Sequence, residues 1–295
     1  ALCFDWVAPW RYLVAAFMRC AREMSIPVLS LPHGVLIYTN EDIKIGSIDQ
    51  ERNFKKFNRY DAIAVQNSLF KETIIKSGIA SDKIFVLGSA RYCDEWVGQN
   101  KKILPRLKNL QPQNNMALKV VFMTTRPNYK IHVERMLKTF DVLSKLTGIK
   151  VVIKPHTRSG EEAKIYENLA IANVSGISSV ELCEWADVML VIGSSILIEA
   201  LVQRKPVLYL KYLHENTTQY EEFGACWTIR DEIQLKDALR DLQENKTKVP
   251  YAHENVEKFL SEIIYGGPDE RDVLGDYEVF IAKRSIKPII SNRPF

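Results

Sequence analysis

The chain has 295 residues, of which 46% are hydrophobic and 26% charged, values typical of a globular protein long enough for two domains. Its net charge of +4 suits contact with anionic nucleotides or an acidic membrane surface, but it is far from the basic stripe of a nucleic-acid-binding protein. No apolar run reaches the roughly 18 residues that a transmembrane helix needs. We expect no nucleic-acid partner and no membrane span.

The start of the chain is apolar but contains Asp5 and Arg11 and follows no basic region, so we do not expect a signal peptide. The sequence begins within a predicted strand, and we therefore expect it to be part of a longer protein. An odd number of cysteines, five, without CxxC spacing is typical of reduced thiols and predicts a cytoplasmic location. The five histidines lack HxxxH and HExxH spacing, so no zinc is expected.

In residues 1–97, short apolar runs alternate with amphipathic segments. This alternation predicts an α/β domain with a parallel sheet covered on both faces. Compared with a full Rossmann-like domain, it lacks two or three strands. The predicted strands are 2–7, 27–31, 61–65 and 83–87, and the predicted helices are 10–24, 50–58 and 68–77.

Residues 98–116 interrupt the alternation, because Gln, Asn, Lys and Pro dominate there as in an interdomain linker. A second Rossmann-like domain is predicted over 117–250, and residues 251–295, with a helix at 255–265, are expected to pack back on the first domain. The strands predicted in the second domain are 118–123, 150–153, 188–192 and 206–210, and its helices are 132–146, 161–169, 179–185, 195–203 and 233–244.

Hydroxyl and basic side chains follow three strands of the second predicted domain. In open α/β sheets ligands bind outside the carboxyl ends of the strands, where hydroxyls, cations and helix N-termini can hold a phosphate. Each group also has a simpler interpretation, as helix caps for the serines and as a solvated loop for the basic residues. The three groups are Thr124-Thr125-Arg126, Lys154-Pro155-His156-Thr157-Arg158 and Gly193-Ser194-Ser195.

Two further polar positions belong to the same predicted domain. Glu199 lies four residues after Ser195, on the same helix face, where a carboxylate can hold a ribose diol. His214 and Glu215 follow the strand predicted at 206–210 and are candidates for a loop that contacts the donor. The aromatic residues between 212 and 227 are predicted to pack in the core and at its rim.

Polar residues also end strands of the first domain. His33 and Gly34 directly follow strand 27–31, where the imidazole is either a general base or ligand of the acceptor, or a buried histidine without catalytic role. Asp5 ends the first strand and is either a catalytic carboxylate or, the favoured interpretation, the N-cap of the next helix. Arg91 follows the last strand and either faces the cleft between the domains or pairs with an acidic neighbour at 94 or 95.

Several segments resemble known enzymes. LCEWADVMLVIGSSILIEALVQRKPVLYL resembles the second-domain signature of GT-B glycosyltransferases that build bacterial surface polysaccharides. KPHTR is similar to the HP element of enzymes that use CMP-activated acids such as Kdo or sialic acid, and VLGSARYCDEW to a junction of the capsule-synthesis group. PHGV resembles the HG loop shared with CDP-glycerol glycerophosphotransferases. The resemblance spans about 27–239 and departs from the pattern at Ala90 and Thr157, where proline is usual, and at Arg204, where glycine is usual.

The resemblance implies a GT-B glycosyltransferase with two Rossmann-like domains facing each other across a cleft. It implies sugar transfer from a nucleotide-activated donor, CMP-Kdo-like or a UDP-sugar, to a capsule, lipopolysaccharide or lipid-linked acceptor, without a cofactor or metal. His33 and Asp5 would lie on the acceptor side. Peripheral contact with the inner face of the membrane would come from basic residues at 101–108 or from a partner. The residues that would contact the nucleotide are Lys154, His156, Ser194, Ser195 and Glu199.

Three alternatives remain open at this point. A CDP-glycerol-type polyol-phosphate transferase shares the HG and serine-rich elements. A nucleotide-sugar 2-epimerase has the same fold but needs no acceptor. A nucleotide-sugar-binding subunit without catalytic activity would retain only the second domain's chemistry.

Overall fold

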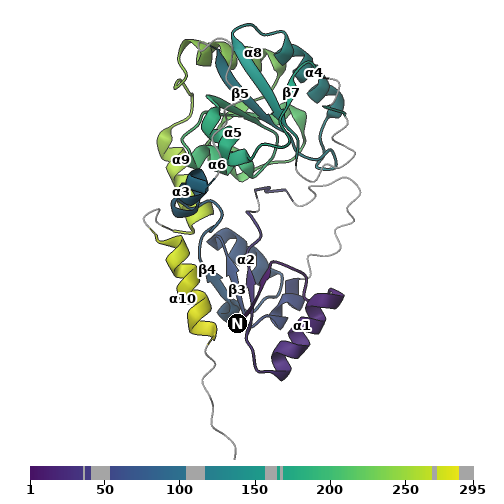
Figure 1. The fold of residues 1–295 in the computed structure, drawn as a ribbon, viewed down its shortest axis with the longest axis vertical. Coiled ribbons are helices and arrows are strands. Elements are labelled where there is room, and N and C mark those ends of the chain that lie inside the picture. Colours follow the sequence, from purple (N-terminus) through teal and green to yellow (C-terminus); the bar gives the residue numbers. More distant parts are fainter. Residues whose placement is uncertain are drawn as a thin grey trace, which may run out of the picture. The chain divides into compact units, whose positions relative to one another are not determined.

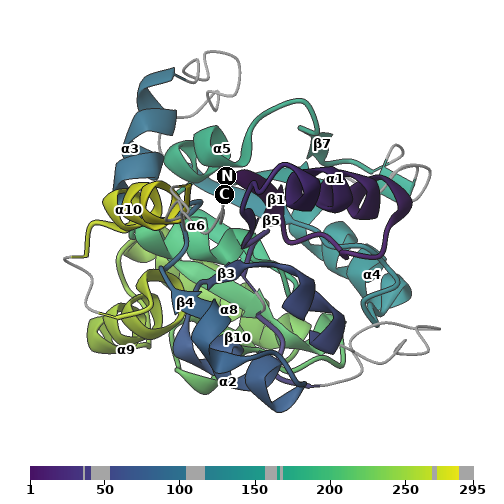
Figure 2. The same ribbon diagram turned by 90° about the horizontal axis from the view of Figure 1, so that it is seen from below.

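The computed structural model describes residues 1–35, 37–40, 54–103, 117–156, 165–166, 169–267 and 271–285 (Figures 1 and 2). The chain forms two compact units, and it passes between them more than once. Unit 1 consists of Ala1–Val35, Asp49–Trp96 and Ser261–Phe295, and unit 2 of Leu36–Ile48 and Val97–Leu260. Among the described residues, no helix is both long enough and apolar enough to cross a membrane.

Unit 1 contains a four-stranded parallel sheet in the order β1-β2-β3-β4. Parallel neighbours require a crossover between strands, which α1 (Tyr12–Glu23) and α2 (Ser68–Lys76) supply after β1 and β3. Every residue of β3 is buried, as expected for an inner strand covered on both faces. The strands are β1 (Leu2–Asp5), β2 (Val28–Leu31), β3 (Ala62–Val65) and β4 (Ile84–Val86).

The C-terminal part of the chain completes unit 1. The π-helical turn η5 (Leu260–Tyr265) and α10 (Val273–Ser285) follow α9 (His253–Phe259) of unit 2. The Ser89 N–H donates to the Ile264 carbonyl at 2.6 Å, and the Tyr277 hydroxyl donates to the Gly88 carbonyl at 2.9 Å. A side chain at Gly88 would place its Cβ 2.6 Å from the Tyr265 carbonyl oxygen, so only glycine fits beside this segment.

Unit 2 contains a six-stranded parallel sheet in the order β10-β9-β8-β5-β6-β7. The first strand, β5, has the second on one side and the fourth on the other, which is the doubly wound Rossmann order. The strands are β5 (Leu118–Met123), β6 (Ile149–Lys154), β7 (Ala172–Asn173), β8 (Val188–Val191), β9 (Val207–Leu210) and β10 (Trp227–Ile229).

Helices cover this sheet on both faces, and α5 packs directly against α6 (Figures 1 and 2). The Ser178 side chain accepts from the Glu181 N–H and the Glu181 carboxylate accepts from the Ser178 N–H, a reciprocal capping box that begins α5. The helices of unit 2 are α4 (Val133–Ser144), α5 (Ser179–Trp185), α6 (Ile196–Val202), α7 (Gln219–Glu222), α8 (Glu232–Glu244) and α9.

The predicted α/β class with two Rossmann-like sheets is confirmed, and most predicted elements lie within a few residues of their observed bounds. Strands β7 and β10 were not predicted, because two or three residues are too few to show a period. Helix α3 (Asp94–Ile103) begins before the predicted linker and continues into it; residues 104–116 lie outside the described part. The helix predicted at 50–58 is a 3-10 helix, Phe54–Arg59, where described, and most of the one predicted at 161–169 lies outside the described residues.

Arg204 has a left-handed backbone, with φ of +54°, directly after α6. Its N–H donates to the Leu201 carbonyl and the Lys205 N–H donates to the Ala200 carbonyl, each at 2.9 Å. These two bonds form a Schellman motif, which favours glycine at the left-handed position. The turn therefore explains why glycine is usual at this point of the surface-polysaccharide pattern.

Replacing Arg204 by glycine should stabilise the protein, because a side chain in the left-handed region costs about 1 kcal/mol. We expect Arg204→Gly to raise the free energy of unfolding by about that amount in urea denaturation. Arg204→Ala is the control, since it removes the same charge but keeps the Cβ. An equal gain in both variants would assign the effect to the side chain and not to the backbone.

Candidate functional site

The reversal of strand order in unit 2 lies between β5 and β8, so the crevice at their carboxyl ends is where a ligand of this fold binds. Thr124 and Thr125 follow β5, and Gly193 and Ser194 follow β8. We call this region, together with the ends of β6 and β9, the donor edge. Two of the three predicted anion-binding groups follow β5 and β8, between which the strand order reverses. The third follows the neighbouring strand β6.

The ends of β5 and β6 are joined by hydrogen bonds. The Thr124 hydroxyl accepts from the His156 N–H at 3.2 Å, and the Thr124 N–H donates to the Lys154 carbonyl at 3.1 Å. The Lys154 side chain is buried, and its ammonium donates to the Ser175 carbonyl beyond β7. Burial lowers the pKa of Lys154. The Lys154 ammonium thus lies at the donor edge. Arg126, directly after Thr125, is half-buried. Thr157 and Arg158 lie outside the described residues.

Gly193 is required by the space around it. Its φ is +43°, and a Cβ would lie 2.9 Å from the Tyr38 hydroxyl oxygen and 3.2 Å from His214 Cε1. The Ser194 hydroxyl accepts from the Ile196 N–H at 3.4 Å, so the capping interpretation applies to Ser194. It does not apply to Ser195, whose side chain makes no capping bond at the start of α6.

Glu199 lies inside unit 2 on α6 and is 5% exposed. Its carboxylate accepts from the Ser179 hydroxyl of α5 at 3.3 Å. A charge buried this far needs polar partners, because desolvation of a carboxylate is costly. The role of Glu199 toward a ribose stays a prediction.

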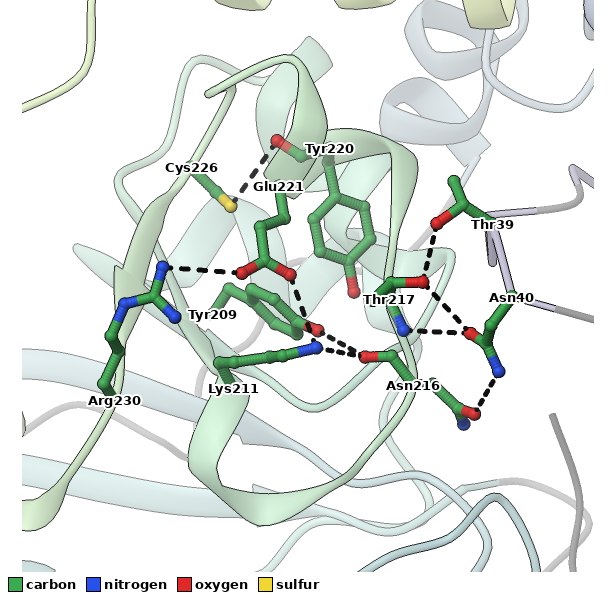
Figure 3. A network of polar contacts seen from close by, with 10 residues as sticks. All are labelled: Thr39, Asn40, Tyr209, Lys211, Asn216, Thr217, Tyr220, Glu221, Cys226 and Arg230. Atoms are coloured by element: carbon green, nitrogen blue, oxygen red, sulfur yellow. Dashed lines mark hydrogen bonds and ion pairs between the residues drawn. The ribbon is translucent and has the colours of Figure 1, made fainter. Parts of the chain in front are cut away.

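The segment 37–40 joins unit 2 beside the loop that follows β9, a contact with no sequence signal. The Gln219 N–H donates to the Ile37 carbonyl at 2.8 Å, and Tyr38 forms an antiparallel bridge with Thr218. Figure 3 shows the side chains that fix the rest of the segment. The Thr39 hydroxyl donates to that of Thr217 at 2.7 Å.

Asn40 and the charged residues behind it complete this network (Figure 3). Asn40 donates to the Asn216 side-chain oxygen at 2.9 Å. The Lys211 ammonium donates to the Asn216 carbonyl at 2.5 Å and lies 3.5 Å from Glu221 Oε2. The other oxygen of that carboxylate, Oε1, lies 3.7 Å from Arg230. The loop predicted to contact the donor therefore holds the 37–40 segment in place.

Tyr38 connects the two strand ends at the reversal. Its hydroxyl donates to the Gly193 carbonyl and is hydrogen-bonded to the Thr125 side chain. Its ring stacks on Tyr129 with centroids 5.8 Å apart and planes 20° apart. Burial raises the pKa of Tyr38, so the hydroxyl remains protonated. The sequence analysis missed this residue.

His214 is buried at the donor edge, 3% exposed, and neither ring nitrogen has a hydrogen-bond partner in the described structure. Its ring lies 5.3 Å from that of Tyr209. Burial, and then the charges of Lys211 and His132, lower the pKa of His214 to about 3. The neighbouring Glu215 is exposed.

In unit 1, Asp5 and His33 form a pair at the carboxyl ends of β1 and β2. The Asp5 carboxylate lies 2.6 Å from His33 Nδ1, and the side chains are 64% and 55% exposed, respectively. The favoured N-cap interpretation of Asp5 is wrong, because α1 is preceded by Arg11 and has no side-chain cap. The buried-histidine interpretation of His33 is also wrong. Gly34 follows with φ of +126°.

Two other expectations can be compared with the structure. The Arg91 guanidinium lies 5.2 Å from the centre of the Tyr92 ring, and within the described residues it forms no ion pair with Asp94 or Glu95. The expected core packing of the aromatic residues is confirmed: Tyr212 and Tyr220 are buried, and Trp227 packs against the core of unit 2. No group of three or more potential metal-ligating side chains occurs in the described part of the chain.

The neutral His214 should make the stability of the protein depend on pH. Its pKa is about 3 in the folded state, whereas an exposed imidazole titrates near 6.5. Between these values the unfolded chain binds more protons. The contribution of His214 to the free energy of unfolding is therefore complete above about pH 6.5. It is lost as pH falls, by up to about 1.4 kcal/mol per pH unit.

Urea denaturation of the native protein and of His214→Phe at about pH 7.5 and about pH 5 checks this sign. The variant should gain stability relative to the native protein at the lower pH, by at most about 2 kcal/mol. Titration of other groups cancels in the comparison. A difference that does not change with pH would mean that His214 titrates normally in the folded protein.

No protein-family model matches the chain, and no curated protein matches it. Among solved structures, a variant of the wall teichoic acid polymerase TagF soaked with CDPG has a TM-score of 0.55 and 15% identity, over 88% of this chain and 68% of that chain. The UDP-GlcNAc 2-epimerase of Methanocaldococcus jannaschii with UDP-GlcNAc and UDP has a TM-score of 0.53 and 16% identity, over 83% and 71%. A Listeria monocytogenes protein assigned as a UDP-N-acetylglucosamine 2-epimerase reaches 0.58 and 16%, over 96% and 73%. The chain thus has the GT-B fold, with two Rossmann-like sheets.

Proposed function

We propose that the chain is a metal-independent glycosyltransferase that moves a sugar from a nucleotide-activated donor to a glycan or lipid-linked acceptor. Unit 2 binds the nucleotide at its donor edge, and unit 1 activates the acceptor hydroxyl. The observation that carries the proposal is the exposed pair of His33 and Asp5, since two residues far apart in sequence meet at one sheet edge with a general base's geometry.

The pair has the chemistry of a base held by a carboxylate. With Asp5 bound at Nδ1, we assign the Nδ1 proton to that contact, which makes Nε2 the basic nitrogen. An acceptor hydroxyl transfers its proton to Nε2 as its oxygen attacks the donor's reacting carbon. Asp5 stabilises the imidazolium that forms. The half-exposed ring suits a substrate that arrives from solvent.

At the donor edge, the leaving phosphate needs hydrogen-bond donors and positive charge. Lys154 supplies an ammonium there, Thr125 and Ser194 supply hydroxyls, and the turn at Gly193 lets the ligand approach the backbone. CMP-Kdo-like and UDP-linked sugars are both candidate donors. The similar structures that contain CDPG or UDP-GlcNAc support donors linked through a diphosphate as well.

A CDP-glycerol-type polyol-phosphate transferase is the second candidate, and the similarity to TagF favours it. The same base would activate the acceptor, but the attack would be on phosphorus and the leaving group would be CMP. A 2-epimerase, favoured by the two epimerase structures, would instead convert a nucleotide sugar with no acceptor present.

Thermal shifts with CMP, CDP, UDP, GDP, CDP-glycerol and UDP-GlcNAc separate the sugar transferase from the polyol-phosphate transferase, whereas conversion of UDP-GlcNAc with no acceptor present would identify a 2-epimerase. A ligand at a hundred times its Kd stabilises the folded state by about 2.7 kcal/mol, which is easily measured as a rise in Tm. We expect stabilisation by a pyrimidine nucleotide and by its sugar conjugate. Stabilisation by CDP-glycerol alone would favour the polyol-phosphate transferase over the sugar transferase. The absence of stabilisation by any of these nucleotides would refute the proposed function.

Removal of the base should abolish transfer without affecting the donor. We expect His33→Gln to reduce kcat at least a hundredfold, because general-base catalysis contributes about 10²- to 10⁴-fold. Asp5→Asn should also reduce kcat, since it loses the carboxylate that holds the ring. The Kd of the nucleotide should be unchanged in both, because the donor edge lies in unit 2.

The matched control is His253→Gln, which removes another exposed histidine that contacts a carboxylate, that of Glu257 at 3.3 Å. This variant should keep full turnover. Normal turnover in His33→Gln would exclude His33 as the base.

A further inference from the structure

We infer that Tyr38 is a positioning residue of the donor edge, whose hydroxyl fixes the Gly193–Ser194 peptide so that the Ser194 N–H is available to the donor's phosphate. This inference rests on the proposed binding of a nucleotide by unit 2. It adds to that proposal a residue from the first part of the chain, together with the part of the donor that it serves.

The position of Tyr38 supports the inference first. Its hydroxyl bonds the Gly193 carbonyl after β8 and the Thr125 side chain after β5. These are the two strands between which the sheet order reverses, where a ligand of this fold binds. The Tyr38 side chain thus bridges the two walls of the expected crevice.

Peptide planarity extends the effect of this bond to the next residue. In a trans peptide the C=O and the following N–H point in opposite directions. With the Gly193 carbonyl held by Tyr38, the Ser194 N–H must point to the other side of the peptide. No group of the described residues accepts that N–H. An N–H left without an acceptor from the described residues can donate to a ligand, and a phosphate oxygen is a strong acceptor for it.

The surroundings keep Tyr38 in one orientation. Tyr129 stacks on its ring, and the bridge to Thr218 fixes its backbone. On the other side, the Tyr38 hydroxyl packs directly on the Gly193 backbone. A Cβ added to Gly193 would lie only 2.9 Å from the Tyr38 hydroxyl oxygen. A group fixed in this way orients its partner before the ligand arrives, which reduces the cost of binding.

The inference assigns the effect to the phosphate and not to the base or sugar of the donor. Tyr38→Phe is the direct test, because it deletes one oxygen and keeps the ring that stacks on Tyr129. We expect this variant to weaken UDP and CMP binding about two- to tenfold in calorimetric titration, the usual loss for one hydrogen bond between neutral groups. Binding of uridine and cytidine, which lack phosphate, should be unchanged.

Tyr251→Phe is the matched control. Its hydroxyl also hydrogen-bonds a backbone group, because it accepts from the Val207 N–H at 3.2 Å. This bond lies at the beginning of β9, at the opposite edge of the same sheet. This variant should bind UDP and CMP as the native protein does. Retention of the far-UV spectrum in both variants shows that unit 2 remains folded.

Three results would overturn the inference: native UDP affinity in Tyr38→Phe, an equal loss in Tyr251→Phe, or an equal loss for nucleoside and nucleotide. Failure of the proposed function gives a different result, since the unmodified protein would then bind none of the nucleotides. In that case the inference falls as well, without any measurement on Tyr38→Phe.

Discussion

The parallel pairing of β5 with β8 is the constraint on which the donor edge depends. Because β5 pairs with β6 on its other side, the connections that leave β5 and β8 run to opposite parts of the sheet, and ligands of this fold bind where the strand order reverses in this way. The residues that give the donor edge its chemistry follow these two strands and their neighbours β6 and β9, except Tyr38, which comes from the 37–40 segment. Gly193 lets the chain turn there, and Tyr38 holds both ends at a defined separation.

A similar constraint acts in unit 1. The register of β1 on β2 places Asp5 opposite Leu31, so the residue two positions later, His33, reaches the same edge. The hydrogen bond between the two side chains follows from this register, not from their separation of 28 positions in the sequence. Each unit thus uses the carboxyl edge of its parallel sheet to collect polar residues from different parts of the chain.

The donor edge costs stability. The ionisable Lys154 side chain is buried there, and His214 is buried with no hydrogen-bond partner among the described residues. Buried polar groups in native proteins are usually satisfied, and exceptions concentrate where a ligand or water completes the site. The apolar strands around them provide the compensating burial, since every residue of β8 and β9 is buried.

The sequence by itself determined the elements whose signal is local. Leu118–Met123 and Ser179–Trp185 have their predicted bounds, because an apolar run and a capping box are read within a few residues. It also named most of the polar groups at the strand ends, and both members of the His33–Asp5 pair, but not their contact. Only the tertiary structure showed Tyr38 at the donor edge, because its partner Gly193 lies 155 positions away. Side chains separated this far meet only after strand order and register are set, and no local pattern encodes that adjacency.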